Sequence, residues 1–430
     1  MTGRFVAAVD GVSALGRLFL EASGGWRARV RAALTVPEGQ RAAMAVLRWV
    51  KPHLTLKANL VACYEGEGTL LVTRAADVAE VLAREADFAV VYGPRMRALT
   101  GGRDFFLGLQ DGPLYRRDTE AMAAIVNADD LDAVLVMARR EAAAAVEAAT
   151  GPEGGGVIDL PPVLSARIPA LMVQQWFGVT GGLALEQLIA DATALFHYLF
   201  SDLGAEPQVT EAAMAAAARV NAAIGASQAT AGPETLLARA CARGAEGDPA
   251  FDADGVRTQM IGLLIGAIPT LSKAACLAVE ELLRRPGALK GAERAARAGD
   301  EARVGDYLFE ALRFSPVNPV IYRRAVADTR LGGTTVPKGR MVLAANLSAM
   351  HDGAAVDEPD QFRPGRPWDQ YLLWGAGVHR CWGDRVNRAI LPAMLMPLLA
   401  KPGLRQLAPP DGAGTPFPRH YRLTWGGGAG

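Results

Sequence analysis

One cysteine stands in surroundings that suit chemistry. Cys381 lies in the stretch WGAGVHRCWG, residues 374–383. A cysteine binds a metal ion only as the thiolate, so its surroundings must favour the anion. A helix is predicted to begin just after Cys381, which places backbone N–H groups and the positive end of the helix dipole near the sulfur. A lone cysteine is usually a small buried hydrophobe, but these neighbours favour a metal ligand.

The residues around Cys381 also suit a flat ligand. Glycine lets the backbone approach such a ligand closely, and three glycines are present: Gly375, Gly377 and Gly383. Trp374 and Trp382 are large enough to shield the sulfur from water. The stretch therefore predicts a protected site for a thiolate and a flat partner.

A second candidate site lies in the longest apolar run of the chain. Residues 266–270 read GAIPT, two small residues followed by a proline and an alcohol. Pro269 has no N–H group and frees the carbonyl of Ile265, so we expect the helix to kink there and to offer that carbonyl to water. A kink without chemistry is the plainer interpretation.

The elements that must position these residues are mostly helical. Residues 113–300 are rich in alanine with helical periodicity, and the longest helix is predicted to begin near Asp252 or Asp254 and to end at Arg285, before Pro286. Strands are expected only near the ends of the chain, at 59–73, 320–331 and 340–346. Further helices are predicted at 75–85, 306–314 and 383–400. The predicted fold class is mainly α with small β-sheets.

Composition narrows the function classes. Lys plus Arg and Asp plus Glu both total 45 in 430 residues, so no net field recruits nucleic acid or an anionic membrane. The four cysteines have no C-x-x-C spacing, which argues against a zinc site or a disulfide framework. Charges interrupt the N-terminal apolar residues, so no signal peptide or membrane span is expected. We expect a soluble, cytoplasmic and monomeric protein with a helical extension at 1–50 and a single domain at 51–430.

The stretch around Cys381 resembles the haem-binding loop of the cytochrome P450 family, which reads aromatic, Gly, x, Gly, x, basic, x, Cys, x, Gly. The residues that fit are Trp374, Gly375, Gly377, His379, Cys381 and Gly383, although the family usually has Phe at the first position. The resemblance implies a triangular helical array around a buried haem b, with Cys381 as the thiolate ligand of the iron.

Two further motifs resemble the family in order and spacing. Glu310 and Arg313 lie three apart on a predicted helix, where an exposed pair would contribute only about 0.2–0.5 kcal/mol. In the family such a pair meets an arginine from a downstream segment, and Arg366 in FRPGR holds that place. The resemblance implies a buried triad of Glu310, Arg313 and Arg366.

Haem carries two propionates, which need cationic or hydrogen-bonding partners once they are buried. By resemblance, His379 and Arg323 take two of these positions. The early helix matches the family only in part, because Tyr115 stands at the usual histidine position and Thr119 at the arginine position. Arg116 is a candidate substitute, and a solvent-facing Arg116 is the alternative.

The resemblance implies a monooxygenase, with one departure. A thiolate trans to the open iron position favours O–O cleavage, which consumes protons when O2 is the oxidant. In the family an acid and a threonine on the long helix relay those protons, whereas here Gly266, Ala267 and Thr270 are present and Pro269 replaces the acid. One possibility is that Thr270, Ser272 and the Ile265 carbonyl organise water for O2 activation.

The alternative is an oxidant that is already reduced. A peroxygenase, or a lipid hydroperoxide isomerase or lyase, needs no such relay, and a proline before threonine resembles the fatty-acid peroxygenase branch. That branch has Arg where Ile268 stands here and an insertion in its cysteine loop that this chain lacks. Haem carriage or gas sensing without catalysis is a third class, and no output domain is recognisable.

Substrate and partner are predicted only as classes. Apolar pocket residues are expected before the early helix, on the long helix and after the E-x-x-R helix: Phe105, Phe106, Leu107, Leu264, Ala267, Ile268, Val317, Asn318 and Val320, with a lid at Phe196, His197, Tyr198 and Phe200. They indicate a hydrophobic substrate, although such positions are also ordinary core. Arg380, Arg385 and Arg388 suit an acidic ferredoxin or a flavin electron donor, the alternative being a solvated helix face.

Overall fold

The computed structural model describes residues 2–23, 25–26, 29 and 36–426. The chain forms two compact units, each built from two stretches of sequence. The first contains Met1–Val91 and Phe309–Cys381, and the second contains Tyr92–Leu308 and Trp382–Gly430. A boundary at residue 50 stays a prediction.

The first unit is built around a five-stranded sheet. Its strand order is β1-β2-β8-β5-β3, in which β2 and β8 are parallel and all other neighbours are antiparallel. Helix α4 covers the sheet with Val78 and Val81, which are fully buried. The elements are β1 (His53–Leu56), β2 (Thr69–Val72), α4 (Ala75–Ala83), β3 (Phe88–Ala89), β5 (Ile321–Ala325), the hairpin β6 (Thr329–Leu331) and β7 (Thr334–Val336), and β8 (Met341–Ala344).

Two strands joined by a glycine turn were predicted within 59–73, and the first of them, beginning at Asn59, is wrong. Here the Asn59 amide donates to the carbonyl of Tyr64, and its side-chain oxygen accepts from the N–H of Val61. These local bonds hold the backbone in a turn, which Asn favours over a strand. The partner of β2 is instead β1, which lies earlier in the chain.

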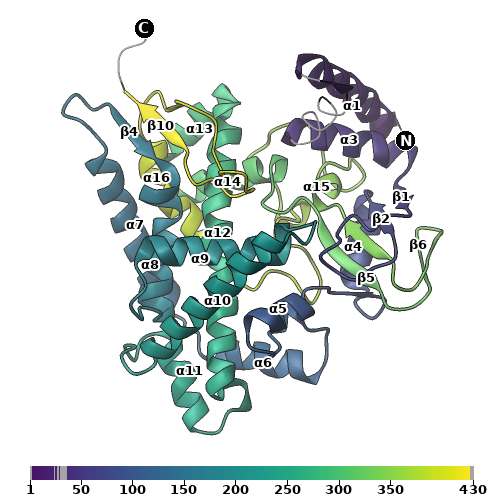
Figure 1. Cartoon of the computed structure of the whole chain (residues 1–430). Helices are drawn as coiled ribbons and strands as arrows, with labels where there is room; N and C mark the ends of the chain where they lie inside the picture. The colour runs from purple at the N-terminus through teal and green to yellow at the C-terminus, as the bar shows by residue number, and fades with distance from the viewer. Residues whose placement is uncertain (1, 24, 27–28, 30–35, 427–430) are drawn as a thin grey trace. The chain divides into compact units, whose positions relative to one another are not determined.

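The N-terminal helices belong to the first unit. Helix α1 (Thr2–Glu21) lies along α3 (Pro37–Val50), as Figure 1 shows. Arg4 on α1 binds Asp352 with two hydrogen bonds of 2.8 Å, and Asp352 follows the short helix α15 (Asn346–Ala349). The ion pair fastens α1 to a segment more than three hundred residues away.

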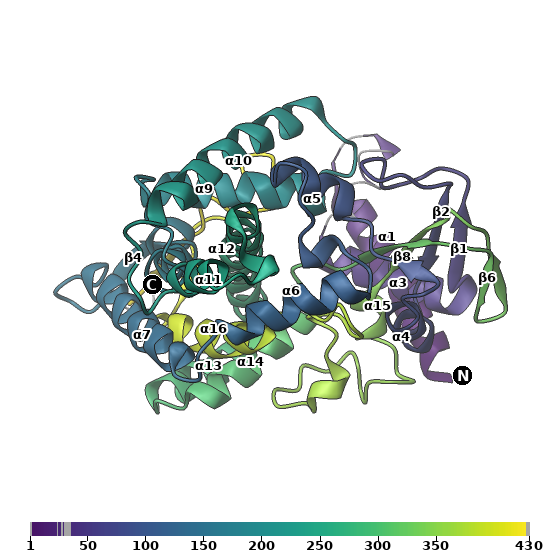
Figure 2. The same cartoon turned by 90° about the horizontal axis from the view of Figure 1, so that it is seen from below.

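The second unit is helical, with α12 (Ala253–Leu283) at its centre. Asp252 caps α12 by accepting the N–H of Gly255 at 2.7 Å, so of the two predicted caps Asp252 is the one used. Figure 2 looks along α12, which α9, α10, α11 and α16 surround. α12 is long and apolar enough to cross a membrane, but 72% of its apolar window is buried inside the protein, as in a core helix.

The other elements of this unit complete the helical layer. The helices are α5 (Gly93–Leu99), α6 (Pro113–Ala124), α7 (Asp130–Ala148), α8 (Arg167–Met172), α9 (Leu185–Phe196), α10 (Pro207–Ser227), α11 (Leu236–Ala245), α13 (Pro286–Arg297), α14 (Glu301–Phe314), which continues into the first unit, and α16 (Asp384–Leu399). A small sheet has the order β4 (Gly156–Asp159), β10 (Arg422–Trp425) and β9 (Arg405–Gln406). The predicted class, mainly α with small β-sheets, is confirmed.

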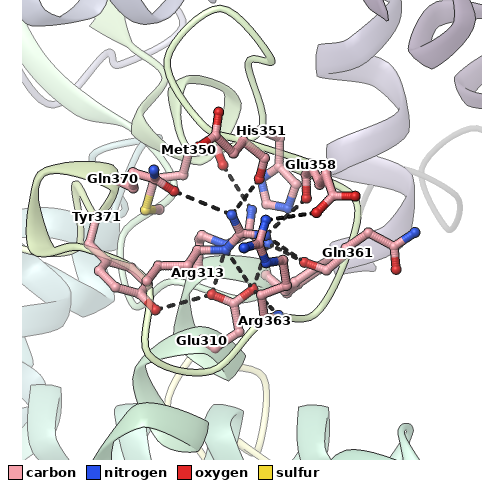
Figure 3. Close-up of polar contacts among 12 residues, drawn as sticks. Glu310, Arg313, Met350, His351, Glu358, Gln361, Arg363, Gln370 and Tyr371 are labelled. Atoms are coloured by element: carbon pink, nitrogen blue, oxygen red, sulfur yellow. Dashed lines mark hydrogen bonds and ion pairs between the residues drawn. The ribbon is translucent and has the colours of Figure 1, made fainter.

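A buried ionic cluster holds the second stretch of the first unit to α14 (Figure 3). Arg313 donates to both oxygens of Glu310 at 2.8 and 3.1 Å, and Arg366 donates to the same carboxylate at 3.1 Å. All three side chains are at most 2% exposed. The triad of Glu310, Arg313 and Arg366 therefore forms as predicted.

Further groups complete the Glu310 cluster. The hydroxyl of Tyr371 and the backbone N–H of Arg363 also donate to Glu310, at 3.1 and 2.9 Å. Burial, together with the Glu310 carboxylate, raises the pKa of Tyr371 well above its usual range. The other N–H groups of the two arginines donate mainly to backbone carbonyls, among them those of Met350, Gln361 and Glu358. These partners together offset the cost of burying the Glu310 carboxylate.

Replacing Glu310 by Gln tests this cluster. The change keeps the shape but leaves two buried arginines without their counterion, so we expect the free energy of unfolding to fall by about 3–5 kcal/mol. Urea titration followed by circular dichroism measures the loss.

The matched control is Glu358→Gln, because the Glu358 side chain is 66% exposed and pairs with the exposed side chain of Arg363. It should cost less than about 1 kcal/mol. Equal losses for the two variants would contradict the structural role of Glu310.

Candidate active site

The cysteine loop, residues 374–381, turns sharply at two glycines. Gly375 and Gly377 have φ values of 69° and 74°, a region that side chains other than glycine rarely adopt. A Cβ atom at Gly377 would lie 2.4 Å from the carbonyl oxygen of Leu82, so no other residue fits there. The N–H of Cys381 donates to the carbonyl of Trp374 at 2.9 Å and closes the loop.

Aromatic side chains connect the cysteine loop to the Glu310 cluster. Trp374 packs on Phe309, with ring centroids 5.6 Å apart, and on Trp368 at 5.5 Å. Phe309 precedes Glu310 on α14, and Trp368 also contacts Tyr371, which donates to Glu310. Trp374, which was expected to shield the sulfur, therefore also packs the cysteine loop against α14. Tyr371 belongs to this group of aromatic residues, and no local sequence motif predicted it.

The residues after Cys381 form the second stretch of the second unit. Helix α16 begins at Asp384, as the predicted helix start requires. Gly383 precedes it with a φ of −87°, an ordinary value, so its backbone conformation does not demand glycine. Trp382 packs against the apolar core of the second unit and contacts Phe106, with ring centroids 6.2 Å apart.

The first unit supplies a histidine and an arginine of the predicted site. His379 contacts Glu85 through Nε2 at 2.5 Å, and both side chains are nearly buried. Arg323 on β5 is 4% exposed and donates to the carbonyl of Tyr322 at 2.9 Å. A nearly buried histidine and a buried arginine fit groups that meet a buried anion. Glu85, just past α4, had no recognisable signal in the sequence.

The early helix supplies less than predicted. Arg116 on α6 is 65% exposed and binds Asp111 with two hydrogen bonds of 2.9 and 2.8 Å. That hydrogen bond raises the pKa of Arg116. Tyr115 packs against the core, and Thr119 donates to its backbone carbonyl at 2.9 Å. In this structure Arg116 thus takes the solvent-facing alternative, and its role at a propionate stays a prediction.

The second unit supplies a stripe of small residues on α12. Gly266, Ala267 and Thr270 are partly exposed, whereas Ile265 and Ile268 beside them are buried. A Cβ atom at Gly266 would meet no heavy atom within 4 Å, so space lies open above this stripe. The Thr270 hydroxyl donates to the carbonyl of Gly266, which leaves its lone pairs to accept a hydrogen bond from water or a ligand.

Ser272 does not join Thr270. The Ser272 hydroxyl lies 3.3 Å from the hydroxyl of Ser165. Ser272 comes two residues after Thr270 on α12, which corresponds to a rotation of about 200° around the helix axis. The expectation that Ser272 helps Thr270 to organise water is therefore wrong. Pro269 and Ser272 instead line a cavity of about 460 Å3 in the second unit.

The predicted pocket residues separate into two groups. Phe105, Phe106 and Leu264 are at most 2% exposed in the core of the second unit, and Ile268 is buried there and also lines the cavity. In the first unit Val317 and Val320 are partly exposed and Asn318 is exposed, in the loop between α14 and β5. The apolar residues that predicted a pocket on α12 thus belong to the packed core as much as to a binding surface.

The cations around Cys381 differ in their surroundings. Arg380 and Arg385 are exposed. Arg388 is half-buried and lies 3.3 Å from Asp384 one turn earlier on α16, so part of its charge is offset. Two exposed arginines therefore flank the cysteine in the chain.

These residues fit a haem. Among the residues that the structure describes, no group of three or more His, Cys, Asp or Glu side chains can hold a metal ion. In the first unit the loop offers the sulfur of Cys381, and Arg323 and His379 offer side-chain nitrogen atoms. In the second unit the α12 stripe leaves open space.

Comparisons with known proteins agree with this assignment. The family model described as Cytochrome P450 matches residues 306–401, which contain the Glu310 cluster and the cysteine loop. Nocardicin C N-oxygenase from Nocardia uniformis subsp. tsuyamanensis is 30% identical over 270 residues, or 60% of this chain and 63% of that protein. Cytochrome P450 76M5 from Oryza sativa subsp. japonica is 32% identical over 154 residues, or 30% of this chain and 31% of that protein. The chain thus spans less than two thirds of the length of either relative.

Solved structures share the fold over most of the chain. P450BioI, in complex with an acyl carrier protein ligated to hexadec-9Z-enoic acid, has a TM-score of 0.75 at 18% identity, covering 91% of this chain and 99% of its own. Cytochrome P450 CYP109Q5 from Chondromyces apiculatus has a TM-score of 0.72 at 20% identity, covering 92% and 97%. With the motifs in place and the fold shared, the chain belongs to the cytochrome P450 family, whose cofactor is haem.

Proposed function

We propose that this protein is a haem-thiolate monooxygenase that inserts one oxygen atom of O2 into a hydrophobic small molecule. The observation that carries the proposal is the cysteine loop, closed by the Cys381–Trp374 hydrogen bond and packed on the Glu310 cluster. A thiolate-ligated haem supplies the O–O cleavage that oxygen insertion requires. Within the family, one relative, Nocardicin C N-oxygenase, is itself an oxygenase by name.

The chain's own residues have separable roles in this proposal. Cys381 ligates the iron, while Arg323 and His379 hold the propionates. Gly266 and Ala267 keep the open space on α12 clear of side chains. The hydroxyl oxygen of Thr270 would accept a hydrogen bond from water, because its proton is already donated to the carbonyl of Gly266.

Electrons come from a partner protein in this proposal. Arg380 and Arg385 are exposed on either side of Cys381 in the chain, with Arg388 one turn further on. Such cations steer an acidic ferredoxin or flavin donor toward the thiolate side. A soluble enzyme in the cytoplasm, where reduced donors are present, fits this arrangement.

One observation favours a second candidate function, the use of peroxide or a lipid hydroperoxide. Pro269 stands where the family's relay has an acid, and no Asp or Glu lies between Leu263 and Leu271. A peroxygenase, or a hydroperoxide isomerase or lyase, needs no proton relay for dioxygen.

Turnover under two regimes separates the two functions. A panel of hydrophobic compounds is incubated with O2 and a reduced ferredoxin system, and in parallel with hydrogen peroxide alone. We expect product with the ferredoxin system because Cys381 lies between two exposed arginines in the chain, Arg380 and Arg385. Product only with peroxide would overturn the monooxygenase proposal in favour of the second candidate.

Replacing Pro269 by Asp tests the missing acid. Position 269 lines the 460 Å3 cavity, so a carboxylate there has room and access to water. A positioned acid typically contributes about 10²-fold or more to a proton-transfer step, and we expect several-fold more product per O2 consumed.

The control for this substitution is Pro269→Asn, which restores the same backbone N–H and side-chain size without the acid. An equal gain in both variants would assign the effect to the helix backbone rather than to proton delivery.

A further inference from the structure

One lysine follows the stripe on α12 that Gly266, Ala267 and Thr270 form. Lys273 comes three residues after Thr270 and seven after Gly266. These spacings place side chains one above another on the same face of a helix. Because helical side chains lean toward the N-terminus, the stem of Lys273 covers the turn that contains Thr270. The lysine therefore belongs to the same face of α12 as the stripe.

The same lysine lines the cavity of the second unit. Pro269 and Ser272 line this cavity together with Lys273, and its volume is about 460 Å3. The lining also contains the side chains of Thr193 and His197, which can form hydrogen bonds with water. A water molecule occupies about 30 Å3 in the liquid, so the cavity has room for several beside these polar groups. Lys273 thus lies where the cavity and the stripe adjoin.

Pro269 opens the backbone of α12 beside this lysine. Pro269 lies inside the helix, and without an N–H group it cannot complete the helical hydrogen bond to the carbonyl of Ile265. Lys273 follows Pro269 by four residues, which is about one helical turn. We expect cavity water to donate to the Ile265 carbonyl, because a buried carbonyl that loses its helical partner takes another one. Water therefore has a place in the turn between Pro269 and Lys273.

The surroundings of Lys273 suit a group that gives up a proton. Its ammonium nitrogen lies 5.2 Å from the centroid of the Phe417 ring, inside the lining. Burial lowers the pKa of Lys273 to about 8. General acids work best when their pKa lies near the working pH, and enzymes lower lysines to about 7–8 for this purpose. Lys273 keeps partial exposure to solvent, so water can return the proton that it gives up.

The other ionisable groups of the lining differ from Lys273 in place or in charge. Glu186 on α9 and Arg419 near the C-terminus are exposed and opposite in sign. Burial lowers the pKa of His197, which keeps its imidazole neutral at pH 7. Helix α10 and residues 161–166 contribute uncharged side chains. Among the described residues of this lining, Lys273 is the one that is both next to the stripe and positively charged at neutral pH.

Two more ionisable side chains follow Lys273 on α12 itself. Cys276 comes three residues later, and burial raises its pKa to about 12, so it stays a neutral thiol at pH 7. Glu280 comes seven residues later and binds Arg284 at 2.5 Å. Both lie on the side of Lys273 that is farther from Thr270.

We propose that Lys273 donates the protons that the reduction of O2 consumes, passing them through water to the hydroxyl of Thr270. It thereby takes over the task of the acid that Pro269 replaces. This role rests on the monooxygenase function proposed above. The geometry that carries it is the position of Lys273 at the edge shared by the cavity, the Pro269 turn and the stripe.

The proton transfer starts and ends with Lys273 as an ammonium ion. Oxygen insertion puts one atom of O2 into the product and turns the other into water, which takes two electrons from the partner protein and two protons. For each proton, an N–H bond of Lys273 breaks and an O–H bond forms on water, which passes a proton to Thr270. The Thr270 hydroxyl turns from the carbonyl of Gly266 and passes its own proton toward O2. Cavity water then returns a proton to the amine.

Replacing Lys273 by Arg tests this role in the haem-loaded protein. Arginine keeps the positive charge and a long apolar stem but does not give up a proton in proteins. With O2, a reduced ferredoxin system and a substrate that the wild type oxidises, we expect product per O2 consumed to fall about tenfold and release of hydrogen peroxide to rise. With hydrogen peroxide as the oxidant, product should stay close to the wild-type amount.

The pH profile adds a readout that packing alone would not change. A proton donor acts in its protonated form, so product per O2 in the wild type should fall as the pH rises through about 8. Lys273→Arg should show no such fall. The matched control is Lys290→Arg, which alters an exposed lysine on α13 and should keep the wild-type profile.

An acid at position 269 should compensate for the loss of the lysine. In the Lys273→Met variant, adding Pro269→Asp should recover most of the lost product per O2. Adding Pro269→Asn instead should recover little, because it restores the same backbone N–H without the acid.

A Lys273→Arg variant that forms as much product per O2 as the wild type would overturn the role of Lys273 and leave the monooxygenase proposal intact. An equal loss of product in the ferredoxin and peroxide regimes would also overturn it, because that pattern indicates damage to the whole site. A wild type that forms no product with the ferredoxin system would instead overturn the monooxygenase function itself, before any variant is compared.

Discussion

The carboxylate of Glu310 is buried and accepts hydrogen bonds from two arginines, a tyrosine and a backbone N–H group. Taking three charges out of water costs several kcal/mol for each ion, and only a complete set of partners offsets that cost. The partners come from α14 and from the segment between Met350 and Tyr371, so the cluster can form only when this segment is in its native place. The cysteine loop follows directly and packs on the same aromatic residues. The position of Cys381 thus depends on an interaction that involves no atom of the loop itself.

Helix α12 shows how one segment serves two surfaces. The small residues Gly266 and Ala267 leave space beside the helix, and Ile268 and Pro269 line a cavity of the second unit. Pro269 also removes the acid that the family uses for proton delivery and one backbone N–H group. The same substitution therefore makes dioxygen chemistry more demanding.

Local motifs with fixed spacing could be predicted from the sequence. The cysteine loop needs glycine where the backbone is left-handed or crowded, and Gly377 meets both conditions, so its spacing is constrained. The Glu310–Arg313 pair follows from helical geometry, and the apolar periodicity with an Asp cap predicted α12. These features depend on neighbours within a few residues.

Features that depend on distant contacts could not be predicted. Tyr371 contacts Glu310 only in the folded chain, and the same holds for Glu85 and His379. No spacing in the sequence predicts either pair. Apolar alternation after Asn59 suggested a strand, but Asn59 closes a turn there. The strand that pairs with β2 is β1, which lies earlier and was not predicted. Leu264 was assigned to a pocket because a core position and a pocket position carry the same apolar residue. The cavity of the second unit joins segments that lie far apart in the chain. The sequence predicted Ile268 and His197 as pocket or lid residues, but not their neighbours from residues 161–166 and 415–419.

The spectrum of the reduced, CO-bound protein tests the central claim, that Cys381 binds the haem iron as a thiolate. The account predicts a Soret band at the thiolate-type position in the wild type, and its loss in Cys381→Ser. The matched control is Cys241→Ser, which removes a partly buried thiol on α11 and should leave the band in place. A thiolate-type band that persists in Cys381→Ser would contradict the assignment of the ligand and the function built on it.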